Sequence, residues 1–140
     1  MQSARTKAFF VRTAGSRRPR TPEGWNALRA KALGRHALTL VWTSARRMRE
    51  LNRTYRGRDA ATNVLAFPLR RDYGEVFLCP ELIKKEASGA DIPFLRHATA
   101  LFAHALLHLR GMRHRTYAAA RRMEREEKKL LWWYNKTYKR

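Results

Sequence analysis

The order of strand-like and helical segments is the feature that most limits the folds open to this chain of 140 residues. Segments rich in aromatic and β-branched residues predict short strands over residues 7–13, 38–42, 63–69 and 75–78. Helical spacing of apolar residues separates the first three strands, and only helical patterns follow the last one. This order predicts an α+β fold, with one mixed sheet of about four strands and about five helices packed on it.

Capping residues and prolines predict the helix boundaries. The first helix is expected to begin at Pro22, with Thr21 as its N-cap, and to end at Gly34. Ser44 is expected to cap a second helix, and residues 53–61 are expected to form a basic loop because they show no helical or strand period. Further helices are expected over residues 80–87, from Pro93 to about Arg110, and from Tyr117 into the 130s.

Turn chemistry predicts how the last two strands pair. Residues 72–74 (DYG) indicate a turn, so the strands on either side should form a hairpin. Pro68 has no backbone N–H to donate, and it therefore predicts that its strand lies at an edge of the sheet or ends there.

Charge is the strongest signal in the composition. The chain carries 31 Lys and Arg against 11 Asp and Glu, a formal net charge of +20. A field of this size attracts polyanions, so nucleic acid is favoured as partner over an anionic membrane or a merely solvated surface. The only cysteine, Cys79, excludes an internal disulfide and a thiolate metal cluster and suits a reducing compartment.

Length and composition fit a single, monomeric domain over residues 1–140, with a basic N-terminal strand and connector (1–22) and a basic aromatic C-terminal tail (131–140). No apolar run approaches the ~20 residues of a membrane span, and no secretory signal is visible. The expected location is the bacterial cytoplasm. The N-terminus, which has no acidic residue before Glu23, also has the composition of an organelle transit peptide, which would place the protein in an organelle matrix.

The histidines carry the chemistry. His104 and His108 are four residues apart on the helix expected after Pro93, so both side chains leave the same face. Gly111 ends that helix and lets the chain return His114 as a third ligand. Three neutral imidazoles and an open position for water are the ligands of a catalytic zinc site, and zinc lowers the pKa of such a water to roughly 7. His97 is expected to have a structural or supporting role rather than to bind the ion.

The same histidine spacing occurs in zinc proteases, which place a Glu directly after the first histidine as general base. Here Ala105 stands in that position, and residues 92–123 contain no Asp or Glu, so peptidase activity is disfavoured. Arginines fill that stretch instead, and guanidinium groups bind phosphate oxygens and favour the charge of a phosphoryl transition state. The candidate RNA-binding residues are Arg53, Arg58, Arg96, Arg110, Arg113 and Arg115.

Segments 51–68 (LNRTYRGRDAATNVLAFP), 74–87 (GEVFLCPELIKKEA) and 104–114 (HALLHLRGMRH) resemble the three signature blocks of the YbeY endoribonucleases. The resemblance implies a zincin-like α+β domain and a zinc-dependent, single-strand-specific endoribonuclease that acts in ribosomal RNA maturation and ribosome quality control. It also implies that His104, His108 and His114 bind the metal, and that Arg56 is the catalytic arginine, beside the metal and the scissile phosphate. Ribosomal RNA or the small ribosomal subunit would be the partner.

Ala105, Arg113 and Glu75 depart from this family pattern, which usually has Gly, Asp and Asp in these places. Arg113 matters most, because a carboxylate near a ligand imidazole orients it and strengthens metal binding. The added cation can instead lower the pKa of the metal-bound water and attract phosphate.

Three functions remain open at this point. The first is a nuclease in which metal-activated water, or the 2′-hydroxyl of the RNA, attacks the phosphodiester. The second is a non-catalytic RNA-binding ribosome-assembly factor with a structural metal. The third is membrane binding by the basic C-terminus with Trp132, Trp133, Tyr134 and Tyr138, for which core packing and RNA stacking are the favoured alternatives.

Overall fold

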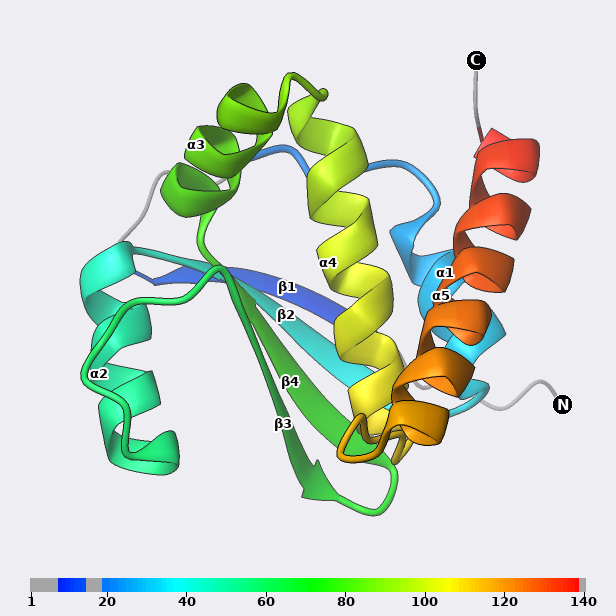
Figure 1. Ribbon diagram of the computed structural model, residues 1–140, viewed down its shortest axis with the longest axis horizontal. Helices are drawn as coiled ribbons and strands as arrows, with labels where there is room; N and C mark the ends of the chain where they lie inside the picture. The colour runs from blue at the N-terminus through cyan, green and yellow to red at the C-terminus, as the bar shows by residue number, and fades with distance from the viewer. Residues whose placement is uncertain (1–7, 15–18, 139–140) are drawn as a thin grey trace, which may run out of the picture.

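The computed structural model describes residues 8–14 and 19–138 of the chain. Its elements follow in the order β1 (Phe9–Ala14), α1 (Trp25–Leu33), β2 (Ala37–Thr43), α2 (Ala45–Arg56), β3 (Val64–Arg70), β4 (Tyr73–Leu78), α3 (Pro80–Ala90), α4 (Phe94–Leu109) and α5 (Tyr117–Tyr138) (Figure 1). Within the described ranges the strands form one sheet and only helices follow β4, which confirms the predicted α+β fold. Residues 1–7 and 15–18, which include parts of the predicted N-terminal strand and connector, lie outside the described residues.

The sheet has the strand order β1-β2-β4-β3. β1 and β4 both pair with β2 in parallel, whereas β3 pairs with β4 as the predicted antiparallel hairpin. β3 forms one edge of the sheet, and its register shifts between Pro68 and Arg70. The position of Pro68 on an edge strand is therefore confirmed.

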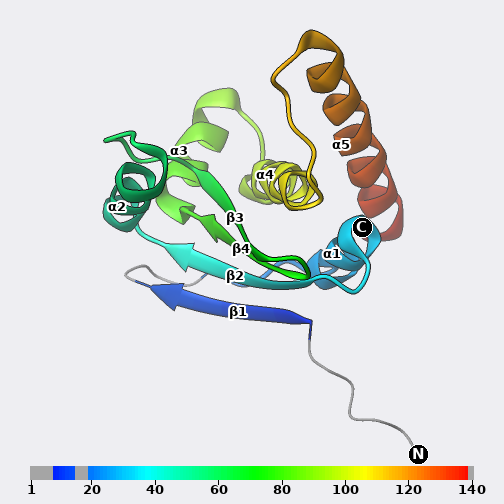
Figure 2. The same ribbon diagram turned by 90° about the horizontal axis from the view of Figure 1, so that it is seen from below.

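Helices pack on both faces of the sheet, and β2 is buried along nearly its whole length. Leu38, Leu40 and Trp42 belong to the larger core cluster, shared with α1, α4 and α5, which includes stacked Trp25 and Phe102. Val41 belongs to a smaller cluster with Met48 of α2. Figure 2 shows α4 and α5 on the same side of the sheet, where α4 carries the candidate ligands.

The predicted start of the first helix is wrong. α1 begins at Trp25, and within the described residues no side chain caps its N-terminus, so Thr21 is not the N-cap. The chain turns first, with the Trp25 N–H donating to Pro22 O at 3.4 Å, and enters the helix through Gly24 at φ 87°. Tyr138 packs so closely on Gly24 that a Cβ there would lie 2.6 Å from its ring. A contact from the far end of the sequence therefore decides where α1 begins.

The predicted basic loop at residues 53–61 is wrong over its first part. α2 begins after its predicted cap, Ser44, whose side chain accepts from Arg47 N, and it continues through Arg53 to Arg56. Gly57, at φ 68°, ends it by donating its N–H to Arg53 O. Residues 57–63 then run without helix or strand. Arg56 consequently stands on the last turn of a helix, not in a loop.

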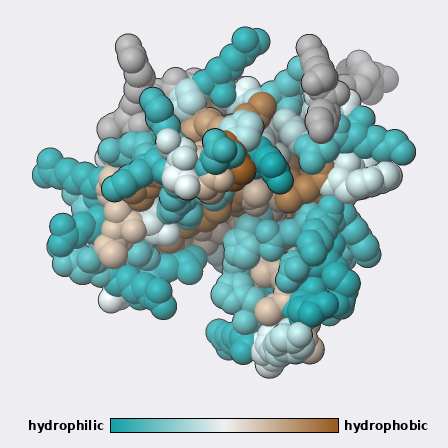
Figure 3. Space-filling view, turned by 45° about the horizontal axis from the view of Figure 1, so that its top comes forward, coloured by the Kyte–Doolittle hydropathy of each residue, from teal (hydrophilic) through white to brown (hydrophobic). Residues whose placement is uncertain are grey.

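The remaining helices lie close to their predictions. α3 starts at Pro80 as expected but continues to Ala90, three residues beyond the predicted end at Ala87, while α4 and α5 match the patterns after Pro93 and from Tyr117. None of the helices in the described part of the chain is long and apolar enough to cross a membrane. Hydrophilic side chains predominate on the face drawn in Figure 3, and the most hydrophobic residues lie between them, mainly in a band across its middle.

Candidate metal centre

α4 presents His104 and His108 one helical turn apart, at the edge of its buried face. Its apolar side, with Phe102 and Leu106, packs into the core, which leaves both imidazoles half-buried. Gly111 adopts φ 100° after the last turn and donates its N–H to His108 O at 3.0 Å, so the chain reverses there. This reversal returns the exposed His114 to the other two imidazoles, as the spacing predicts.

The three imidazoles converge. Each of His104, His108 and His114 offers a ring nitrogen, and these atoms all lie within 4.8 Å of one another. The Nε2 atoms of His104 and His108 are 3.0 Å apart. Nitrogen ligands 2.0–2.1 Å from one tetrahedral ion are about 3.3 Å apart, so this donor set fits a single zinc-sized ion with small adjustments.

His108 is held in the form that binds metal. Burial is the largest cause that lowers its pKa, and charge repulsion from the nearby His104, His114, Arg113 and Arg56 adds to it; together they lower the pKa from 6.5 to about 4. Its imidazole is therefore neutral at pH 7, and only a neutral imidazole has a lone pair for a metal ion.

Glu127 completes the centre, and sequence reasoning missed it. Its Oε2 lies 2.9 Å from Nδ1 of His104. A carboxylate can only accept, so Nδ1 of His104 carries the proton and its Nε2 keeps the lone pair that faces His108. The segment around the histidines holds no carboxylate, and Glu127 comes instead from α5, which packs beside α4. The sequence feature that could have pointed to Glu127 is the acidic cluster Glu124, Glu126 and Glu127 in the amphipathic helix α5.

Arg56, at the end of α2, contacts β3. Its Nη2 donates to Ala66 O at 3.1 Å, and its guanidinium lies 5.7 Å from the ring centre of Phe67. Its charge contributes to the lowered pKa of His108, which places it within electrostatic range of the three histidines. The arrangement leaves an exposed cation beside the centre, held by a backbone carbonyl of the edge strand.

The structure brings only some of the other candidate arginines near the histidines. Arg113 donates to His108 O and Met112 O, at 3.3 and 3.1 Å, and Arg110 caps the end of α4. Together with Arg122 and Glu126 they line a hollow of about 550 Å³. Arg115 is exposed directly after His114.

The other three candidates lie on α2, just after its end, and on α4. Arg53 is exposed on α2, and Arg58 follows the end of that helix. Arg96 stands on the first turn of α4, about 12 Å along the helix from His104 at 1.5 Å per residue, so the structure does not bring it to the centre.

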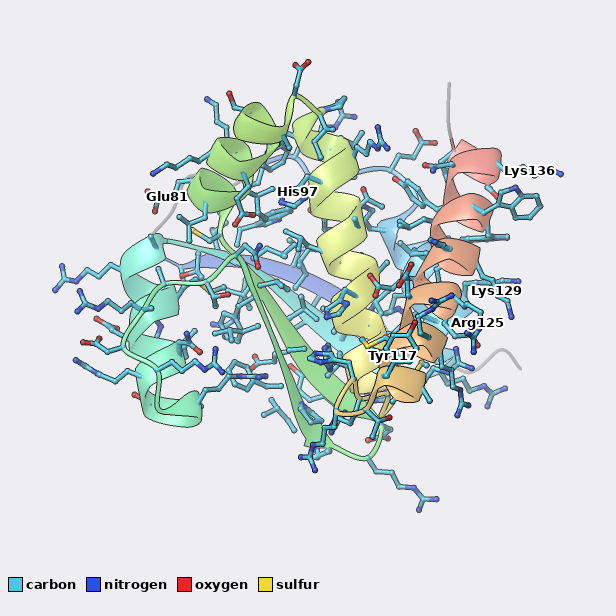
Figure 4. The ribbon with its side chains drawn as sticks, in the orientation of Figure 1. Glu81, His97, Tyr117, Arg125, Lys129 and Lys136 are labelled. Atoms are coloured by element: carbon cyan, nitrogen blue, oxygen red, sulfur yellow. The ribbon has the colours of Figure 1, made fainter. Side chains whose placement is uncertain are left out.

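His97 is not part of the centre. It lies between α3 and α4 (Figure 4), where its Nε2 is 2.8 Å from Glu86 Oε1. Asn63 donates to the same oxygen at 2.9 Å, so these side chains join the start of β3 to both helices. This is the structural role expected for His97.

The known proteins that are similar to this chain share one family name. Residues 25–135 match the family described as Endoribonuclease YbeY. Proteins of that name are similar along most of their length. The one from Paraburkholderia phytofirmans is 34% identical, and the similarity covers 79% of this chain and 74% of the relative. The one from Halorhodospira halophila is 33% identical, and the similarity covers 87% of this chain and 88% of the relative. The solution structure of TM1509 from Thermotoga maritima shares the fold, with a TM-score of 0.57, 21% identity and 93% of each chain covered. The chain therefore belongs to the Endoribonuclease YbeY family.

Proposed function

We propose that this protein is a zinc-dependent endoribonuclease that cleaves single-stranded RNA, with ribosomal RNA of the small subunit as the substrate in maturation and quality control. The name of the relatives, endoribonuclease, supports the reaction, and the net charge of +20 supports a polyanionic substrate. The observation that carries the proposal is the convergence of three ring nitrogens within 4.8 Å of one another. The protein would act as a monomer, and its bacterial relatives support a cytoplasmic location.

His104, His108 and His114 would hold the ion. When bound, zinc supplies Lewis-acid polarisation of a phosphoryl oxygen and a water of lowered pKa. The three imidazoles are neutral ligands, so they leave the positive charge of the ion available to the phosphate. The donor set contains no thiolate and no direct carboxylate among the residues that the structure describes.

Glu127 fixes the proton of His104 on Nδ1 and so keeps Nε2 free for the ion. Arg56 would bind a non-bridging oxygen of the scissile phosphate and stabilise the charge that grows in the transition state. Ala66 O and Phe67 hold this guanidinium in place before RNA arrives, which lowers the cost of ordering it. Arg110 and Arg113 would take a neighbouring phosphate of the strand.

The experiment compares the wild type with His114→Ala, Arg56→Ala and His36→Ala, the last as a matched control because His36 contacts Ala37 O and lies outside the centre. Metal content, RNA binding and cleavage of single- and double-stranded RNA are measured for each. We expect His114→Ala to lose metal and cleavage but to retain salt-sensitive RNA binding, since Lys and Arg contacts supply most of the affinity. Full cleavage by His114→Ala would reject the role of the metal centre in the reaction. A wild type that does not cleave RNA, with binding unchanged in His114→Ala, would favour a non-catalytic factor with a structural ion.

The cleavage products separate two routes of attack. A 2′,3′-cyclic phosphate end would mean that the 2′-hydroxyl of the RNA attacks the phosphorus. A 5′-phosphate end that carries solvent oxygen, with a 3′-hydroxyl on the other fragment, would mean that water attacks, because the 2′-hydroxyl route leaves the phosphate on the 3′ side.

A further inference from the structure

Basic and aromatic side chains gather on the part of α5 that faces away from the metal centre. Lys31 of α1 and residues of α5 line a hollow of about 420 Å³, and Lys136 lies beside it over the ring of Trp132. Figure 4 shows Lys129 and Lys136 pointing away from α4. We define the tryptophan–lysine surface as Lys31, Lys128, Lys129, Trp132, Trp133 and Lys136.

Packing explains most apolar residues of α5 but not Trp132. Leu130 and Tyr134 are buried in the main core, and the Tyr134 hydroxyl donates to Glu23 O at 2.5 Å. Tyr138 packs on Gly24. Trp132, by contrast, is 64% exposed, so the core gains little from it. A large exposed aromatic side chain among cations is a feature of binding surfaces.

The lysines of this surface are placed around the two indoles. Lys136 Nζ lies 4.7 Å from the ring centre of Trp132, and Lys31 Nζ lies 5.5 Å from that of Trp133. The exposed Lys128 and Lys129 make ion pairs with the exposed Glu124 and the half-buried Glu126, at 3.1 and 3.5 Å. Exposed pairs of this kind are weak, and a phosphate can replace the carboxylate. Four lysines against two glutamates leave the surface positive.

Single-stranded nucleic acid fits this chemistry. Its bases stack on aromatic rings without regard to sequence, while its phosphates bind the surrounding cations. An anionic membrane fits less well, because insertion needs a broad apolar face and the exposed residues next to Trp132 are charged or polar.

The surface lies apart from the metal centre. Trp132 follows Glu127, the partner of His104, by five residues, which turns it about 140° around α5 and moves it about 7.5 Å along the axis. RNA bound at both places must therefore pass around the helix. A second contact on the same strand raises the affinity for long RNA by effective concentration.

We propose that the tryptophan–lysine surface is a second binding site for single-stranded RNA, on which bases stack against Trp132 and phosphates contact the lysines. The inference rests on the proposed function for its choice of RNA as ligand. Binding is nevertheless measurable without cleavage, so the two proposals can fail separately.

The test measures the affinity of full-length protein for a long, unstructured oligoadenylate in the His114→Ala background, which does not cleave under the proposed function. Trp132→Ala should weaken binding about 5-fold or more, the effect of losing one stacked base, and Trp132→Phe should restore most of it. Lys136→Ala should lower the salt slope by about 0.7, the value for one phosphate contact on a single strand. Lys84→Ala removes the same charge from an exposed position of α3. It should change the RNA affinity and the salt slope only as far as the lower net charge of the protein does.

Unchanged affinity in Trp132→Ala, or equal effects of Lys136→Ala and Lys84→Ala, would overturn the proposal. So would loss of binding to anionic vesicles in Trp132→Ala with RNA affinity intact, since the surface would then serve a membrane. A wild type that never cleaves RNA, combined with weakened binding in Trp132→Ala, would reject the nuclease and keep this site.

Discussion

Glu127 accepts a hydrogen bond from Nδ1 of His104 at 2.9 Å, across 23 residues of sequence and between two helices. The contact gives the centre the carboxylate that the segment around the histidines lacks. It also fixes which nitrogen of His104 can face an ion, because one ring nitrogen must carry the proton.

Glu127→Gln should weaken zinc binding roughly 10- to 100-fold, the usual effect of losing a carboxylate behind a ligand histidine. Glutamine can still accept the hydrogen bond, but it lacks the charge that makes the imidazole a stronger base. Competition with a chromophoric zinc chelator measures the affinity without reference to activity. Glu124→Gln is the matched control on the same helix, because Glu124 is exposed and pairs with Lys128. Equal affinities of the two variants would show that Glu127 does not support the ligand.

Arg56→Ala should lower kcat on single-stranded RNA by about 10²- to 10³-fold, the cost of removing one preorganised group that stabilises transition-state charge. Zinc content should not change, because Arg56 contacts Ala66 O and Phe67 rather than a ring nitrogen. Single-turnover cleavage at saturating protein separates this loss from weaker binding. Arg46→Ala removes the same charge from an exposed position of α2 and should keep kcat within about 3-fold of the wild type, an effect of ~0.7 kcal/mol. Similar losses in both variants would mean that only net charge matters.

The reactivity of the Cys79 thiol provides a test of its burial and of its raised pKa. Its side chain is fully buried, and burial raises the pKa of the thiol above its usual value near 9. A raised pKa means less thiolate at any given pH, so native protein at pH 8 should react with iodoacetamide far more slowly than protein unfolded in urea. Because the chain has no other cysteine, the mass of the product reports this residue alone. Equal rates in the two states would contradict the buried position.

Local patterns were enough to predict that the imidazoles of His104, His108 and His114 converge. His104 and His108 share one helix, and Gly111 stands only three residues before His114, so spacing alone brings the ring nitrogens together. Pro68 on the edge strand was predictable for the same reason, since its missing N–H acts locally. Glu127 was not predictable, because its role depends on how α5 packs beside α4.

The difference between features set by local sequence and features set by packing of distant segments also explains the two wrong helix boundaries. Thr21 and Pro22 form a good capping sequence. Tyr138, however, packs against the backbone just before the first turn of α1, and the glycine at position 24 leaves room for its ring because it has no Cβ. Arg53 to Arg56 contain no apolar stripe because that part of α2 is exposed, so the pattern of burial that identifies helices was missing.

Gly24→Ala should reduce the free energy of unfolding by about 2–4 kcal/mol, which combines ~1 kcal/mol for a side chain at positive φ with ~1–3 kcal/mol for overpacking against Tyr138. Gly57→Ala is the matched control, because Gly57 has a similar φ of 68° and nothing lies within 4 Å of an added Cβ. It should therefore reduce the free energy of unfolding by only the ~1 kcal/mol that comes from the positive φ. Urea unfolding followed by circular dichroism measures both. Tyr138→Ala should remove the difference between the two variants, because the added methyl group at position 24 then has no ring to meet. Equal costs in the presence of Tyr138 would show that the end of α5 does not constrain the start of α1.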